Sequence, residues 1–71
     1  MKRLSDVIVG KYTVRYVDAG HVALHRLASM GIVPDVELEV TSNNIHLPLV
    51  IEVKHSQVTV GRGLASKVLV E

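Results

Sequence analysis

The sequence predicts a mostly β fold, a small barrel of about five strands with one short α-helix inserted after the first strand. Two observations indicate this fold class. Short segments in which apolar and polar residues alternate recur between turn residues, whereas only one segment repeats its apolar residues at helical spacing. The chain has only 71 residues, 48% of them hydrophobic, so we expect residues 1–71 to form a single domain with one small core.

The first strand is predicted over residues 11–17, which alternate and are rich in β-forming residue types. Tyr12, Val14 and Tyr16 should fall on one face, because side chains of a strand point alternately to its two sides. Asp18 is interpreted as a helix N-cap, since its carboxylate could accept hydrogen bonds from unpaired amide groups of the first helical turn.

A short helix is predicted over residues 21–30. Apolar residues that should face the core recur there at helical spacing: Ala23, Leu27 and Met30. Gly31 fits the left-handed position that ends many helices, and in that motif the next residue, Ile32, packs back on Leu27. Pro34 then prevents the helix from continuing.

The second half of the chain predicts further short strands joined by turns. Their inward-facing residues are Val36, Leu38, Val40, Leu49, Ile51, Val53, Val58 and Val60. Ser42-Asn43-Asn44 and His55-Ser56 are expected turns. Residues 61–66 should form a turn with one helical loop before residues 67–70 complete the sheet. Because so small a sheet cannot leave a broad apolar face in water, we expect a partly open SH3-like or OB-like barrel.

The composition argues against several functional classes. The absence of cysteine excludes disulfides and thiolate metal sites and fits a reducing compartment. No apolar run approaches the roughly 20 residues that a membrane span requires, and no signal-peptide core follows the N-terminus. A formal net charge of +1 and only two aromatic residues do not favour nucleic-acid binding. We therefore expect a cytoplasmic protein that works through its surface, without nucleic acid and without direct membrane insertion.

Two blocks of the sequence are distinctive. The first reads RLASMGIVP at residues 26–34, and the second reads VTVGRGLASKVLV at residues 58–70. In this order and at this spacing they resemble the signature of the FeoA family, small accessory proteins of bacterial and archaeal ferrous iron uptake. Leu4 and Gly10 suit the opening pattern of the family, so the resemblance covers nearly the whole chain.

The resemblance implies an SH3-like barrel with an inserted helix, a domain that is also similar to the C-terminal domain of DtxR-type iron-dependent repressors. It further implies a role beside FeoB, a large membrane protein with a cytosolic GTP-binding domain that carries Fe²⁺. We therefore predict a non-catalytic interaction module, not an enzyme, that docks on the cytosolic GTP-binding part of a FeoB-type transporter and modulates it. This role requires no cofactor.

The chain departs from the family pattern at two turns. Asp35 stands where the family usually has glycine, and aspartate also tolerates turn conformations. Lys54-His55-Ser56 occupies a turn in which the family often has glycine. These departures affect the expected shape of the loops and leave the predicted fold unchanged.

Two helix histidines are candidate metal ligands. His21 and His25 are four residues apart on the predicted helix, so both imidazole rings can lie on one face. Imidazole suits Fe²⁺ or Zn²⁺, and Asp18 could add an oxygen ligand. The alternative function is thus a transition-metal-binding sensor or regulatory domain. The competing interpretation is a solvated helix face with two unrelated histidines, because a metal site usually needs three or four ligands.

Four further residues are candidates for partner contacts. Arg62 is one, since arginine is favoured at protein interfaces. Leu24, Val50 and Leu69 are predicted to be exposed apolar residues, and together they could form one docking patch. Edge strands of so small a barrel could also pair between copies, so a homodimer is a further hypothesis.

Glu37 and Glu39 are expected to share one strand face, with their Cα atoms about 7 Å apart. Paired carboxylates at such a separation can perform acid–base chemistry or bind a hard cation. Their alternation with inward-facing aliphatic residues explains both as an outward polar face. No catalytic residue is therefore predicted.

Overall fold

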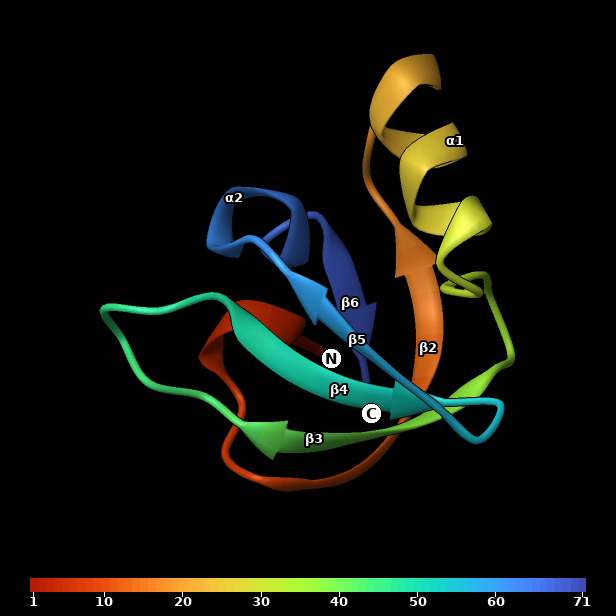
Figure 1. Cartoon of the computed structure of the whole chain (residues 1–71). Coiled ribbons are helices and arrows are strands. Elements are labelled where there is room, and N and C mark those ends of the chain that lie inside the picture. The colour runs from red at the N-terminus through yellow and green to blue at the C-terminus, as the bar shows by residue number, and fades with distance from the viewer.

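Six strands form one antiparallel sheet in the computed structural model, which describes residues 1–71 (Figure 1). The strands are β1 (Lys2–Arg3), β2 (Gly10–Val17), β3 (Glu37–Ser42), β4 (Leu49–Val53), β5 (Ser56–Val60) and β6 (Val68–Val70). Their order is β1-β6-β2-β3-β4-β5, so β1 and β5 are edges and the sheet does not close. The prediction of a mostly β, small SH3-like fold is confirmed. The additional strand, β1, has only two residues and is too short for alternation to reveal it.

Two helices and one 3₁₀ turn complete the fold: η1 (Leu4–Asp6), α1 (His21–Ser29) and α2 (Arg62–Ala65). Figure 1 shows α1 extending away from the sheet after β2. The short helix α2 joins β5 to β6 and contacts η1, which confirms the predicted helical loop. None of these helices combines the length and apolar character needed to cross a lipid bilayer.

The core consists of apolar side chains alone. Fifteen residues are buried, none of them polar or charged, and all belong to one cluster. Strand residues that were predicted to face inward supply part of this cluster: Val14, Leu38, Val40, Leu49, Ile51, Val53 and Val60. Val36 and Val58 are half-buried and pack against it. The alternation predicts these positions correctly because each strand presents one face to the same interior.

A β-bulge in β2 makes the prediction for Tyr16 wrong. The pairing of β2 with β6 changes register between Val14 and Tyr16. A bulge adds one unpaired residue, here Arg15, and thereby shifts the alternation of the following side chains by one position. Val17 is consequently buried, whereas Tyr16 is 54% exposed.

Helix α1 begins without the predicted side-chain cap. The N-cap residue is Gly20, which is extended and carries no capping side chain. Asp18 lies earlier in the chain, and its backbone amide donates to the carbonyl oxygen of Lys67 at 2.8 Å. The prediction that Asp18 caps the helix is therefore wrong, because the extended chain stays paired with the segment before β6 for longer than expected.

The C-terminal end of α1 matches the prediction closely. Gly31 has a left-handed φ of +87°. Its amide donates to Ala28 O at 2.9 Å, and the amide of Ile32 donates to Leu27 O at 2.9 Å. These two bonds define a Schellman motif. Ile32 and Leu27 are both buried in the core, so the motif anchors the end of the helix.

The two turns that depart from the family pattern use left-handed backbone at residues other than glycine. Asp35 has a φ of 75°, and Lys54 and His55 have φ values of 52° and 65°. Lys54 and His55 are the central residues of the hairpin closed by the pair Val53 and Ser56. Positive φ at both central residues is the pattern of a type I′ hairpin turn. A tight turn is present, but it lies one residue earlier than predicted, at Lys54 and His55, and Ser56 already belongs to β5.

Candidate functional site

One arginine joins two loops that lie at the same end of the sheet. Arg62, the first residue of α2, donates from Nη1 to Asn43 Oδ1 at 2.7 Å, to Asn44 O at 3.0 Å and to Leu47 O at 3.3 Å. Its Nη2 donates to Ser5 O at 2.8 Å. The guanidinium group thus holds the β3–β4 loop and the turn η1 together through its rigid, planar set of donors.

Asn43 extends this network by bonding both to Arg62 and to the segment around η1. While its Oδ1 accepts the bond from Arg62, its Nδ2 donates to Val7 O at 2.7 Å and to Ser5 O at 3.3 Å. The sequence-based interpretation placed Asn43 in a turn. Instead Ser42 ends β3, the turn lies at residues 45–46, and Asn43 uses its side chain to bind a distant segment.

Three aliphatic side chains stand out from the two loops held by this network. Ile8 is 80% exposed, Val9 is 57% exposed and Ile45 is 73% exposed. They line a surface hollow of ≈ 470 Å³, and Asn43 and Arg62 are among the other residues that line it. We name Ile8, Val9 and Ile45 the loop platform. Its chemistry suits burial against an apolar surface of another molecule, since clustered exposed aliphatic residues mark interaction sites.

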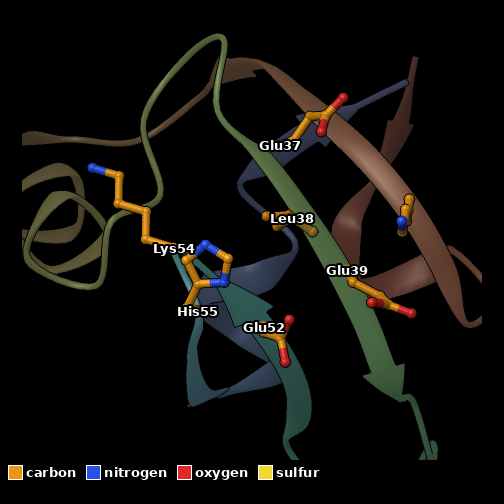
Figure 2. Close-up of a pocket in the computed structure, with 7 residues that line it drawn as sticks. Glu37, Leu38, Glu39, Glu52, Lys54 and His55 are labelled. Atoms are coloured by element: carbon orange, nitrogen blue, oxygen red, sulfur yellow. The ribbon is translucent and has the colours of Figure 1, made fainter.

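A second hollow, of ≈ 330 Å³, lies on the outer face of β3 and β4 and is strongly charged (Figure 2). In the backbone register Lys11 of β2 lies opposite Glu39 of β3, and Glu39 lies opposite Glu52 of β4. One row of charged residues therefore crosses three strands. His55 and Lys54 lie at the adjoining hairpin turn. Figure 2 shows the Lys54 side chain extending away from the carboxylates.

The carboxylates of this second hollow are not arranged as a metal site. Across the whole chain, no group of three or more His, Asp or Glu side chains is placed to hold a metal ion. Glu37 and Glu39 lie on the outward face, as the alternation predicts, and Glu39 faces the like charge of Glu52. Directly opposed like charges on neighbouring strands are mildly destabilising. We therefore interpret this row of charged residues as a solvated face of the sheet.

The predicted metal ligands lie on the exposed side of α1 and just before it. His21 is the first residue of the helix and His25 is its central residue, and both are exposed, as is Asp18. No further histidine or carboxylate joins them to complete a set of three. Metal binding at His21, His25 and Asp18 stays the alternative hypothesis.

The four predicted partner contacts lie on four different elements. Leu24 is on α1 and 40% exposed, whereas Val50 on β4 and Leu69 on β6 are half-buried. Two strands, β2 and β3, separate β4 from β6 in the sheet. Arg62 points its guanidinium at the chain's own loops. Of the four, Arg62 alone borders the loop platform.

Sequence reasoning missed the loop platform and the structural use of Asn43. A weak signal was available. Ile8 and Val9 stand directly before Gly10, outside the predicted strand, and Ile45 stands between the polar residues Asn44 and His46. Apolar residues that belong to no alternating or helical pattern have no assigned core position, and they are therefore candidates for exposure.

Comparison with known proteins gives one consistent result. The FeoA domain family matches residues 2–71. A Methanocaldococcus jannaschii protein whose name refers to Fe(2+) transport protein A is 45% identical over 58 residues, which are 82% of this chain and 70% of that protein. The crystal structure of an iron uptake regulatory protein, FeoA, superimposes with a TM-score of 0.93 at 33% identity, covering 97% of this chain and 93% of that one.

The same fold occurs inside larger proteins. The manganese regulator SloR matches with a TM-score of 0.88 at 21% identity, over 99% of this chain but only 34% of its own. At this level of identity the likeness concerns the fold alone. It agrees with the predicted similarity to a domain of metal-dependent repressors.

Proposed function

This chain belongs to the FeoA family, and from that premise we propose that it is a cytoplasmic accessory protein of ferrous iron uptake. In this proposal it docks on the cytosolic GTP-binding part of a FeoB-type membrane transporter and modulates the activity of that partner. The chain itself catalyses no reaction and needs no cofactor.

The observation that carries the docking proposal is the loop platform. Ile8, Val9 and Ile45 expose most of their aliphatic surface, and covering such surface is favourable by about 25 cal/mol per Å². Arg62 and Asn43 already fix the loops that carry these side chains. Because a pre-organised surface loses little conformational freedom on association, more of the contact free energy contributes to affinity.

Modulation would follow from a difference in affinity. A transporter with a GTP-binding domain passes through at least two states, and a bound protein shifts the balance between them only if it binds one state better. The platform supplies a fixed apolar surface for such a distinction. The direction of the shift, toward transport or away from it, is then set by which state exposes the complementary surface.

The docking proposal can be tested by calorimetric titration of this chain into the cytosolic domain of the FeoB-type transporter from the same organism. Ile8→Lys and Ile45→Lys place a charge on the platform at positions that are exposed in the free protein, so folding should be retained. We expect each to weaken binding by about tenfold or more. The GTP hydrolysis rate of the partner, measured with and without this chain, reports modulation.

Val22→Lys is the matched control, because Val22 is equally exposed (77%) but lies on α1. We expect it to bind like the parent chain. If Val22→Lys bound more weakly while Ile8→Lys bound like the parent chain, the docking surface would lie on α1, and the proposed role of the loop platform would be wrong. No heat of binding for the parent chain at high micromolar concentration would remove the docking proposal altogether.

A further inference from the structure

The two edges of the sheet are protected very differently. The edge strand β1 has only two residues, Lys2 and Arg3, and both carry a positive charge. The other edge strand, β5, has five residues with the sequence SQVTV and carries no charge. Charged side chains, short strands, proline and bulges are the usual protection of an edge against pairing with another strand. β1 has two of these devices, and β5 has none of them.

The unpaired backbone groups of β5 belong to two residues. β5 pairs with β4 without a break in register, from the pair formed by Leu49 and Val60 to the pair formed by Val53 and Ser56. In a two-residue hairpin the pair next to the turn exchanges hydrogen bonds, and the bonded pairs then alternate along the strands. Gln57 and Thr59 are therefore the residues whose N–H and C=O groups point away from β4. Both are exposed, and neither takes part in any hydrogen bond outside the ladder.

We propose that β5 is a self-association edge and that its partner is β5 of a second copy of this chain, in antiparallel orientation. Gln57 and Thr59 lie at equal distances on either side of Val58. A two-fold axis through the Val58 pair therefore sets Gln57 of each copy opposite Thr59 of the other. In this single register the outward N–H and C=O groups of both residues all find partners.

The side chains are compatible with the same register. Gln57 and Thr59 are both uncharged and polar, so no like charges meet across the new pair. Val58 is half-buried in the free chain and packs against the core. In the pair its remaining surface is covered by the same residue of the other copy. An isologous contact of this kind closes at two copies and does not continue into a fibre. The inference goes beyond the proposed function and does not depend on it.

Variants that introduce charges at Gln57 and Thr59 test both the edge and its register by sedimentation equilibrium over a concentration series. The parent chain should show a concentration-dependent shift from monomer to dimer. Gln57→Lys with Thr59→Lys sets lysine opposite lysine in both pairs and should keep the chain monomeric. Gln57→Lys with Thr59→Glu sets lysine opposite glutamate in both pairs and should lower the dimer dissociation constant by about tenfold relative to the parent, with loss of that gain at high salt.

Hydrogen exchange of the parent chain gives a second test that needs no variant. Protection of the Gln57 and Thr59 amides should increase with protein concentration, whereas the Val58 amide, already bonded to β4, should change little. The proposal is overturned if the parent stays monomeric up to about 1 mM, or if the two-lysine variant dimerises as readily as the parent. Failure of the lysine–glutamate variant to associate would reject the stated register.

Discussion

At the scale of the residue, Arg62 connects segments that are far apart in the sequence. Its guanidinium reaches Ser5, which is 57 positions away, and the loop that begins at Asn43, 19 positions away. The acceptors are mainly backbone carbonyl oxygens, so the sequence around them need not reveal the network. An arginine that looks like a free surface residue in the sequence thus serves as the structural support of the loop platform.

We expect Arg62→Lys to destabilise the fold by about 1–3 kcal/mol, because a lysine ammonium cannot reproduce the fork of donors and leaves half-buried acceptors unpaired. Urea denaturation followed by circular dichroism measures this loss. Arg26→Lys is the control, since the Arg26 side chain makes no hydrogen bond or ion pair, and it should change stability by less than about 0.5 kcal/mol. Equal stabilities of the two variants would contradict the supporting role of Arg62.

The histidine pair gives a prediction at the same scale. His21 and His25 supply two exposed imidazoles without a third ligand. We expect equimolar Zn²⁺ or Fe²⁺ to leave the melting temperature of the parent unchanged, because a ligand stabilises a fold only when it binds the native state appreciably. A rise in melting temperature that disappears in His21→Ala/His25→Ala would contradict this and support the metal-sensor alternative.

At the scale of the element, α1 is attached to the body of the protein mainly at its C-terminal end. Leu27 is its only buried residue, and the Schellman motif places Ile32 beside it in the core. The N-terminal half, which carries His21 and Leu24, projects from the sheet (Figure 1). The helix is therefore held by a single buried anchor and its capping motif.

We expect Leu27→Ala to lower the free energy of unfolding by about 2–5 kcal/mol, through lost burial and the cavity left behind. Leu24→Ala removes the same atoms from a partly exposed site on the same helix and should cost less than about 1 kcal/mol. Thermal or urea unfolding of the two variants checks the difference. Similar losses for both would mean that Leu27 is not the anchor.

The hairpin between β4 and β5 carries avoidable strain. Lys54 and His55 both adopt positive φ, a conformation that glycine reaches without the Cβ clash of other residues. We expect His55→Gly to stabilise the protein by about 0.5–1 kcal/mol. His55→Ala is the control, because it removes the imidazole but keeps the Cβ, and it should give no gain. A gain of equal size in both variants would point to the imidazole instead of the backbone.

At the scale of the whole molecule, the charges nearly balance. Eight basic and seven acidic residues give a formal net charge of +1, and three glutamates gather on the outer face of β3 and β4 (Figure 2). Such a surface offers no broad positive field to a phosphate backbone. Recognition by this chain should therefore rest on apolar contact and on unpaired backbone groups at a sheet edge.

We expect no saturable binding of labelled oligonucleotides tighter than about 10⁻⁴ M at physiological salt, measured by fluorescence anisotropy. A variant with Glu37→Lys and Glu52→Lys makes the same sheet face basic and should gain weak binding that falls steeply with added salt. Salt-dependent binding by the parent chain would contradict the prediction and favour a nucleic-acid-binding barrel.

The sequence by itself determined the class of the fold, the inward face of most strands, the end of α1 and the family resemblance. These follow from local rules, since strand alternation, helical spacing and the left-handed Gly31 are properties of neighbouring residues. Tertiary structure alone decided the bulge that exposes Tyr16, the extended backbone at Asp18, the Arg62–Asn43 network and the unpaired edge of β5. Each of these depends on which distant strand or carbonyl group lies beside a residue, and that pairing is fixed only when the whole sheet assembles.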